Sequence, residues 1–206
     1  MDRSEHDFEP IRGLPGQLPP GERIIWQGAP QWRPFLRHAL HSRWIAGYFG
    51  VLGVVAVASG SISGAIATIV SGLIAQGLLA AFAILVARTS VYTLTDRRLV
   101  LRIGVALSAC INLPLALIGS VDLREQGEGS GDIALTLIGR HRLGYAALWP
   151  HVRPLGLTAP RPMLRALPDV AHVGALLAQA CAALPGTRIA PADVSGVRQP
   201  LHGVAA

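Results

Sequence analysis

The chain has 206 residues, of which 51% are hydrophobic, and its formal net charge is +6. Arginine supplies all 18 of its Lys and Arg positive charges, because no lysine is present. A chain this basic has three acidic partner classes: nucleic acid, acidic proteins and the anionic face of a membrane. No basic run with interleaved aromatic residues is present, which argues against nucleic acid. Cys110 and Cys181 are far apart and lack CxxC partners, so we expect reduced, buried thiols rather than a disulfide scaffold or zinc site.

The first part of the chain predicts an arm, a strand and a basic helix. Residues 1–21 are polar and rich in proline and glycine, which indicates an extended arm, and they lack the apolar core of a cleavable signal. The β-branched and aromatic residues of Glu22–Gln27 predict a short strand. Residues 34–43 follow as an amphipathic helix whose arginines could reach lipid headgroups.

A long uncharged segment comes next. The 44 positions from Trp44 to Ala87 contain no Asp, Glu, Arg or His. A bilayer core needs about 20 apolar residues per helical span, so this segment is long enough for two spans. Small residues at 60–64 favour a chain reversal in its middle. We therefore expect a transmembrane helical hairpin, because helices of soluble proteins alternate polar and apolar faces. Arginines on both sides of it predict that both termini are cytoplasmic.

Beyond the hairpin the pattern is that of β-structure. Thr89–Thr95 and Leu99–Ile103 predict two strands joined by a turn. The charge-free stretch Ile103–Val121 has two interpretations: a third membrane span, or two further strands and a turn. Its Gly, Asn and Pro residues favour strands, and a third span would export an arginine-rich tail.

The last third of the chain predicts a hairpin and a helix. Gly127–Asp132 is interpreted as a β-hairpin turn rather than a phosphate loop, because a strand follows it instead of a helix. Arg142–Leu148 is expected to supply the partner strand, and Trp149–Pro168 a connection. A helix is predicted from an N-cap at Asp169 to Leu184, followed by a disordered tail at 186–206.

Few side chains indicate a site, and no catalytic, cofactor or metal set is expected. His38 and His41 could bind a metal or a tetrapyrrole magnesium, but neighbouring arginines favour simple interfacial histidines. Gln76 could hydrogen-bond to the facing helix or to a partner's helix. Helix faces with small residues at four-residue spacing, which include Gly50 and Ala75, could let another helix approach. Three arginines are candidate contacts for headgroups or an acidic partner: Arg97, Arg98 and Arg102.

Five segments in order resemble the PuhB family of photosynthetic-complex assembly proteins. They are FEPIRGLPGQLPPGERIIWQGAPQWRP (8–34), VYTLTDRRLVLRIGVAL (91–107), INLPLALIGSVDLR (111–124), GSGDIALTL (129–137) and LWPHVRP (148–154). The resemblance covers about residues 8–185. It implies a membrane-anchored bacterial PH-like domain of the YdbT type, in which a curved sheet or small barrel is closed by a C-terminal helix.

The expected fold class is therefore an α+β membrane protein with a transmembrane hairpin and a PH-like domain. Its expected parts are an arm (1–21), the first strand of the PH-like domain (22–33), an interfacial segment and hairpin (34–87), the rest of the PH-like domain (88–185) and a tail (186–206).

The resemblance implies a non-catalytic assembly factor for the reaction centre and core light-harvesting complex of purple bacteria. Its partners would be subunits of those complexes and membrane lipids, with a second copy of the chain as a further candidate. Its location would be the inner or intracytoplasmic photosynthetic membrane. The charge pattern alone supports an alternative, a membrane-anchored module that binds anionic headgroups or an unrelated membrane protein. An enzyme of pigment delivery is a third hypothesis, which lacks a recognisable site.

Overall fold

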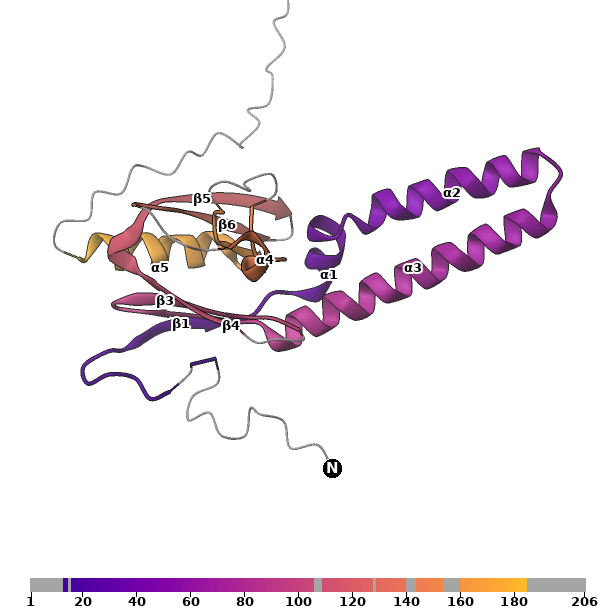
Figure 1. Cartoon of the computed structure of the whole chain (residues 1–206). Coiled ribbons are helices and arrows are strands. Elements are labelled where there is room, and N and C mark those ends of the chain that lie inside the picture. Colours follow the sequence, from indigo (N-terminus) through magenta and orange to yellow (C-terminus); the bar gives the residue numbers. More distant parts are fainter. Residues whose placement is uncertain are drawn as a thin grey trace, which may run out of the picture.

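The computed structural model describes residues 13–14, 16–105, 109–127, 129–139, 144–153 and 160–184. It shows an α+β fold in which a domain built on two sheets carries a pair of long helices that extend from one end (Figure 1). Most of the predicted N-terminal arm and all of the predicted tail lie outside the described residues.

The first sheet is antiparallel, with the strand order β1-β2-β3-β4. Its strands are β1 (Ile24–Gly28), β2 (Val91–Thr95), β3 (Arg98–Ile103) and β4 (Ala109–Pro114). The strands predicted on either side of the uncharged segment are confirmed. β1 pairs directly with β2, with Trp26 opposite Leu94, although both long helices separate them in sequence. The helical pair is therefore inserted between two neighbouring strands of one sheet.

The second sheet is also antiparallel and has the order β5-β6-β7. Its strands are β5 (Ile118–Gly127), β6 (Ser130–Leu137) and β7 (Met163–Leu167). The β5–β6 turn lies where it was predicted, and Gly127 there has a φ of 95°. The described part of 103–121 consists of strands and the 3-10 turn η3 (Leu115–Leu117), so the prediction of strands rather than a third span is confirmed.

Three expectations for this region are wrong. The strands do not form one sheet and do not close into a barrel, because Pro114 ends β4 and the chain turns a corner through η3 into the second sheet. Tyr145–Leu148, expected as a strand, forms the helical turn α4, in keeping with its helix-favouring Ala-Ala-Leu sequence. The strand beside β6 is instead β7, within the expected connection. Residues 140–143 lie outside the described residues.

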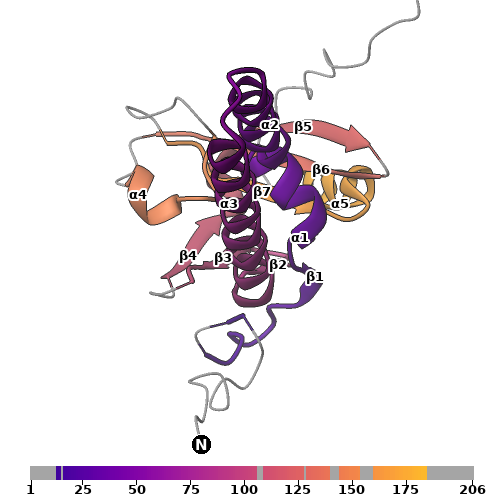
Figure 2. The same cartoon turned by 90° about the vertical axis from the view of Figure 1, so that its right-hand side faces the viewer.

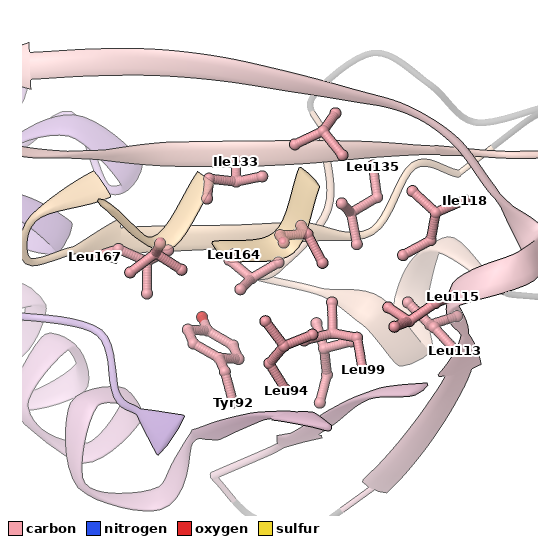
Figure 3. Close-up of a cluster of buried hydrophobic side chains, with 14 of the residues drawn as sticks. Tyr92, Leu94, Leu99, Leu113, Leu115, Ile118, Ile133, Leu135, Leu164 and Leu167 are labelled. Atoms are coloured by element: carbon pink, nitrogen blue, oxygen red, sulfur yellow. The ribbon is translucent and has the colours of Figure 1, made fainter. Parts of the chain in front are cut away.

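The hydrophobic core lies between the two sheets (Figure 3). Tyr92 and Leu99 reach into it from the first sheet, and Ile133 and Leu164 from the second.

The helix α5 (Val170–Ala182) packs on β5 and β6 and also contacts β1. The predicted helix is confirmed, although α5 ends at Ala182 rather than Leu184. Three apolar residues of this segment are buried in the core and two are partly buried: Val170, Val173 and Leu177, then Leu176 and Leu184. Asp169 precedes this helix as predicted, but its carboxylate makes no capping hydrogen bond.

The inserted segment contains α1 (Trp32–Pro34), the π-helical turn η2 (Phe35–Ala39), α2 (Ser42–Ala58) and α3 (Ile62–Thr89). His41 adopts a left-handed conformation with φ of 53°, and the chain bends by 59° between η2 and α2. The apolar side of η2 was expected in a membrane interface. Instead, Phe35 is fully buried against Ala83, Val86 and Ala166.

The helices α2 and α3 run side by side in opposite directions (Figures 1 and 2). Gly72 allows this close packing, since a Cβ atom there would lie 3.0 Å from the Cβ of Phe49. By length and composition, α3 could cross a membrane, and α2 together with the bent segment before it could form a second span. Only 11% of the most apolar window of α3 is buried, so most of this apolar surface faces outward.

Candidate functional site

A cleft of about 680 Å³ lies where the helical pair joins the domain. One wall is the segment from η2 to the start of α2, and the opposite wall is the β5–β7 sheet with the region around α4. Figure 2 looks along the helical pair and shows α1 and the start of α2 beside this sheet. Charged and polar side chains line the cleft, including Arg37, Arg43, Arg124, Gln126, Asp132 and Arg165.

The cleft is strongly basic. Four guanidinium groups face one carboxylate, that of Asp132. Arg124 lies directly opposite Asp132 in the β5–β6 ladder, so both side chains project from the same face of the sheet. Each oxygen of Asp132 accepts a hydrogen bond from a neutral donor, Oδ1 from the Ala166 N–H (2.8 Å) and Oδ2 from Gln126 Nε2 (2.6 Å). No arginine of the cleft forms an ion pair with a described residue.

Arg165 is the most deeply placed of these cations. It is 8% exposed, and its Nη2 donates a hydrogen bond to the Val152 carbonyl at 2.8 Å. Its Nε is buried without a hydrogen-bond partner, as is the Oε1 of Gln126. Buried polar groups of this kind are costly unless another group satisfies them. The floor of the cleft therefore has unused hydrogen-bonding capacity.

A buried polar network supports this floor. Tyr92 Oη accepts a hydrogen bond from the Arg165 N–H (3.3 Å) and lies 2.7 Å from Nδ1 of His151. The other ring nitrogen of His151 lies 3.1 Å from Ser90 Oγ. Desolvation by burial lowers the pKa of His151 to about 3, and the charge of Arg165 acts in the same direction. His151 is therefore neutral at physiological pH and acts as a link between the two sheets.

Aromatic side chains surround the cleft. Trp44, at the start of α2, is 80% exposed, and Trp149 is 52% exposed. The ring of Trp149 lies 5.5 Å from that of Phe82 on α3, which fixes the α4 region against the helical pair. Exposed tryptophans beside arginines are typical of the headgroup layer of membranes.

The three arginines predicted as contacts lie outside the cleft and differ from one another. Arg98 forms a two-pronged ion pair with Glu22, with distances of 2.8 and 3.1 Å. Arg102 is 9% exposed and thus largely withdrawn from solvent. Arg97 is exposed, but it lies at the turn between β2 and β3, at the end of the strands away from the helical pair (Figure 1).

The predicted residues of the helical pair have distinct placements. Gln76 Nε2 donates a hydrogen bond to the Ser42 carbonyl at 2.9 Å, which confirms the facing-helix alternative. Ala75 is half-buried. Gly50 is exposed, and a Cβ atom there would meet nothing within 4 Å, so its face is open to lipid or to another helix.

His38 and His41 both line the cleft, but they face arginines, and the described residues contain no group of three metal-binding side chains. Cys181 is buried as expected, whereas Cys110 is exposed on β4.

The sequence pattern did not predict that Arg37, Arg43, Arg124 and Arg165 line one cleft. The basic character of the segment before Trp44 was visible, but the sheet that faces it comes from residues 80 positions or more later in the chain.

The fold and the sequence together define the class: the chain belongs to the bacterial PH domain family, whose profile matches residues 44–180. It is 34% identical, over 196 residues, to a Rhodobacter capsulatus protein named "uncharacterized 23.7 kDa protein in puhA 5′ region". That alignment covers 89% of this chain and 90% of the relative. No solved structure gives a significant match to this chain.

Proposed function

We propose that this protein is a membrane-anchored, non-catalytic factor that promotes assembly of the photosynthetic reaction centre and its core antenna. The exposed apolar surface of the helical pair is the main support for membrane attachment. Val54 and Leu73, for example, are 69% and 68% exposed. Soluble monomers rarely expose contiguous apolar patches of more than a few hundred Å², so a bilayer or partner helices must cover this surface.

The link to photosynthesis comes from the relative, whose name places it in the region 5′ of the photosynthesis gene puhA. The PuhB-like segments of the sequence support the same assignment. The proposed location is the inner or intracytoplasmic photosynthetic membrane, with both termini in the cytoplasm. The proposed partners are subunits of the reaction centre and core antenna.

The proposed mechanism is a scaffold. The open face around Gly50 docks against subunit helices within the bilayer, while the domain gathers their cytoplasmic segments. Holding two pieces together raises the effective concentration for their next contact without new chemistry. A non-catalytic role suits the cleft as well, because guanidinium groups stay protonated and bind anions rather than transfer protons.

The test is a strain of the photosynthetic host that lacks the gene. We expect less reaction centre and core antenna in its membranes, as measured by absorption spectroscopy, with unchanged bacteriochlorophyll synthesis and subunit transcripts. The intact gene supplied on a plasmid should restore both complexes. Normal complex levels in the deletion strain would refute the assembly role, and loss of pigment synthesis would favour the pigment-delivery enzyme instead.

The cleft favours a second candidate function, the binding of anionic headgroups by a membrane-anchored module. This function was predicted on the basis of Arg97, Arg98 and Arg102. The placement of those residues does not support them as a headgroup site, whereas the arginines of the cleft lie beside the helical pair.

A further inference from the structure

We propose that the basic cleft is a binding site for the phosphate group of an anionic glycerophospholipid of the cytoplasmic leaflet, with phosphatidylglycerol as the best-fitting headgroup. This inference rests on the membrane attachment in the proposed function and is independent of the assembly role. The site would join the domain to the lipid next to its own helices.

The positive charge of the cleft favours an anionic ligand. Arg37, Arg43 and Arg124 are exposed at the cleft, and Arg165 lies at its floor. The carboxylate of Asp132, held by Gln126 and the Ala166 N–H, offsets only one of the four guanidinium charges, so the cleft keeps an excess of positive charge. Arginine matches the geometry of phosphate oxygens with paired N–H donors.

Hydrogen-bond donors at the cleft lack acceptors. The Nε of Arg165 is buried without a partner in a side chain that is only 8% exposed. The N-terminus of α2 borders the same space, with no side-chain cap at His41 and no acidic residue in its first turn. A phosphate in the cleft would supply acceptors at the place where the helix dipole also favours negative charge.

The Gln126 amide favours a headgroup that carries hydrogen-bond donors. Gln126 Nε2 donates to the Asp132 carboxylate at 2.6 Å, which fixes the orientation of the amide. Its Oε1 is consequently an acceptor, and it is buried without a donor. A glycerol headgroup carries hydroxyl donors beside its phosphate, whereas the quaternary ammonium of phosphatidylcholine has none. This difference favours phosphatidylglycerol over phosphatidylcholine.

The position of the cleft along the helical pair favours a lipid over a free anion. The cleft is lined by the residues that immediately precede and begin α2, including Trp44. If α2 and α3 cross the bilayer, Trp44 and the cleft lie at the headgroup layer, and the apolar helix surface below is available to the acyl chains. A phosphate that is attached to a diacylglycerol therefore fits this place better than a free anion from the cytoplasm.

The test uses the full chain purified in a mild non-ionic detergent, with lipids counted by native mass spectrometry. We expect phosphatidylglycerol to bind at least about tenfold more tightly than phosphatidylcholine, and the Arg43→Gln/Arg124→Gln double variant to lose at least about tenfold in phosphatidylglycerol affinity. Both substituted residues are exposed, so folding should be retained, as circular dichroism would verify. Arg97→Gln, at the far turn, is the matched control and should bind within about twofold of the unchanged protein.

Two results would overturn the proposal. The first is equal binding of phosphatidylglycerol by the double variant and the unchanged protein; if that variant also no longer retains reaction-centre subunits, the cleft belongs to an acidic protein segment. The second is displacement of the lipid by inorganic phosphate or glycerol phosphate at the lipid's own affinity, which would identify a free phosphate as the ligand. Because binding is measured on purified protein, a failed deletion phenotype leaves this test unaffected.

Discussion

At the scale of single residues, the imidazole of His151 holds the two halves of the domain together. It is fully buried, follows α4 in the chain, and contacts the hydroxyl groups of Ser90, the C-cap residue of α3, and Tyr92 on β2. Phe35 from the inserted segment packs nearby, with ring centroids 6.0 Å apart. A single neutral side chain thus connects the first sheet, the second sheet and the base of the helical pair.

This burial predicts acid sensitivity. The ordinary pKa of histidine is 6.5, and the folded value is lowered to about 3. Because the folded pKa is lower, the stabilising contribution of neutral His151 is complete above pH 6.5 and is lost as the pH falls from there toward 3. The free energy of unfolding should decrease by up to about 1.4 kcal/mol per pH unit in this window.

Denaturant unfolding of the detergent-solubilised protein at several pH values checks this expectation. The His151→Gln variant keeps a hydrogen-bonding side chain but cannot titrate, so its stability should depend less on pH. If the variant and the unchanged protein have the same slope, the acid sensitivity belongs to other groups.

The ion pair of Arg98 predicts a structural role for that arginine. Its partner Glu22 has a side chain that is only 2% exposed, against 28% for Arg98. Arg98→Gln would leave a buried carboxylate with weaker hydrogen bonding and should lower the free energy of unfolding by about 2 kcal/mol, between the values for surface and buried pairs. Arg97→Gln is the matched control, and the same measurement should show a change below about 0.5 kcal/mol. Equal effects of the two variants would contradict this role.

Residues 97, 98 and 102 show what charge pattern can and cannot predict. In the sequence they are three similar arginines between apolar strands. Their difference depends on Glu22, which is 76 positions from Arg98, and on the burial of β3, in which every residue after Arg98 is buried. Local sequence carries neither fact. The same limit applies to the cleft, whose arginines come from three separate parts of the chain.

At the scale of elements, the pattern of apolar residues predicted the strongly periodic or strongly apolar segments. These include the strands β1, β2 and β3, the long helices α2 and α3, and the amphipathic α5. The strand β7 was missed because all five of its residues are buried, so it has no polar alternation, and prolines surround it. The helical turn α4 was missed because it is only four residues long.

The packing of α5 gives a prediction for the core. Leu177 is 1% exposed and lies between the sheets. An unpaired buried carboxylate costs several kcal/mol, which is close to the whole stability of a domain, so Leu177→Asp should unfold it. Ala178→Asp, on the exposed face of the same helix, should fold normally. Limited proteolysis distinguishes them, and equal protease resistance would contradict the role of α5 in the core.

The open face of α2 gives a prediction for assembly. Because nothing lies within 4 Å of a Cβ atom at Gly50, Gly50→Leu should leave the packing of α2 on α3 intact. It should nevertheless block close approach of another helix and lower the amount of core complex in a complemented deletion strain. Val51→Leu, at a position already 64% exposed, is the control and should complement fully. Full complementation by Gly50→Leu at normal protein levels would exclude this face as the docking surface.

At the scale of the whole molecule, the insertion between β1 and β2 determines how the parts are oriented. Both ends of the helical pair enter the same sheet, since β1 leads into α1 and α3 leads into β2. The pair therefore projects from one end of the domain (Figure 1). The residues that line the cleft lie at its base. If the helices lie in a bilayer, the domain is held at the membrane surface with its arginines toward the headgroups.

The most direct test of this account is the membrane topology of the full chain. The exposed native thiol of Cys110 reports on the domain. An added thiol, Ser63→Cys in a Cys110→Ala background, reports on the exposed start of α3, next to the turn between α2 and α3. Both would be labelled with a membrane-impermeant maleimide at mildly alkaline pH, because burial raises the pKa of Cys110. We predict that the Ser63→Cys thiol reacts in intact spheroplasts, whereas Cys110 reacts only in inside-out vesicles or after lysis. Labelling of Cys110 in intact spheroplasts, or protection of both thiols until lysis, would contradict a cytoplasmic domain anchored by a transmembrane helical pair.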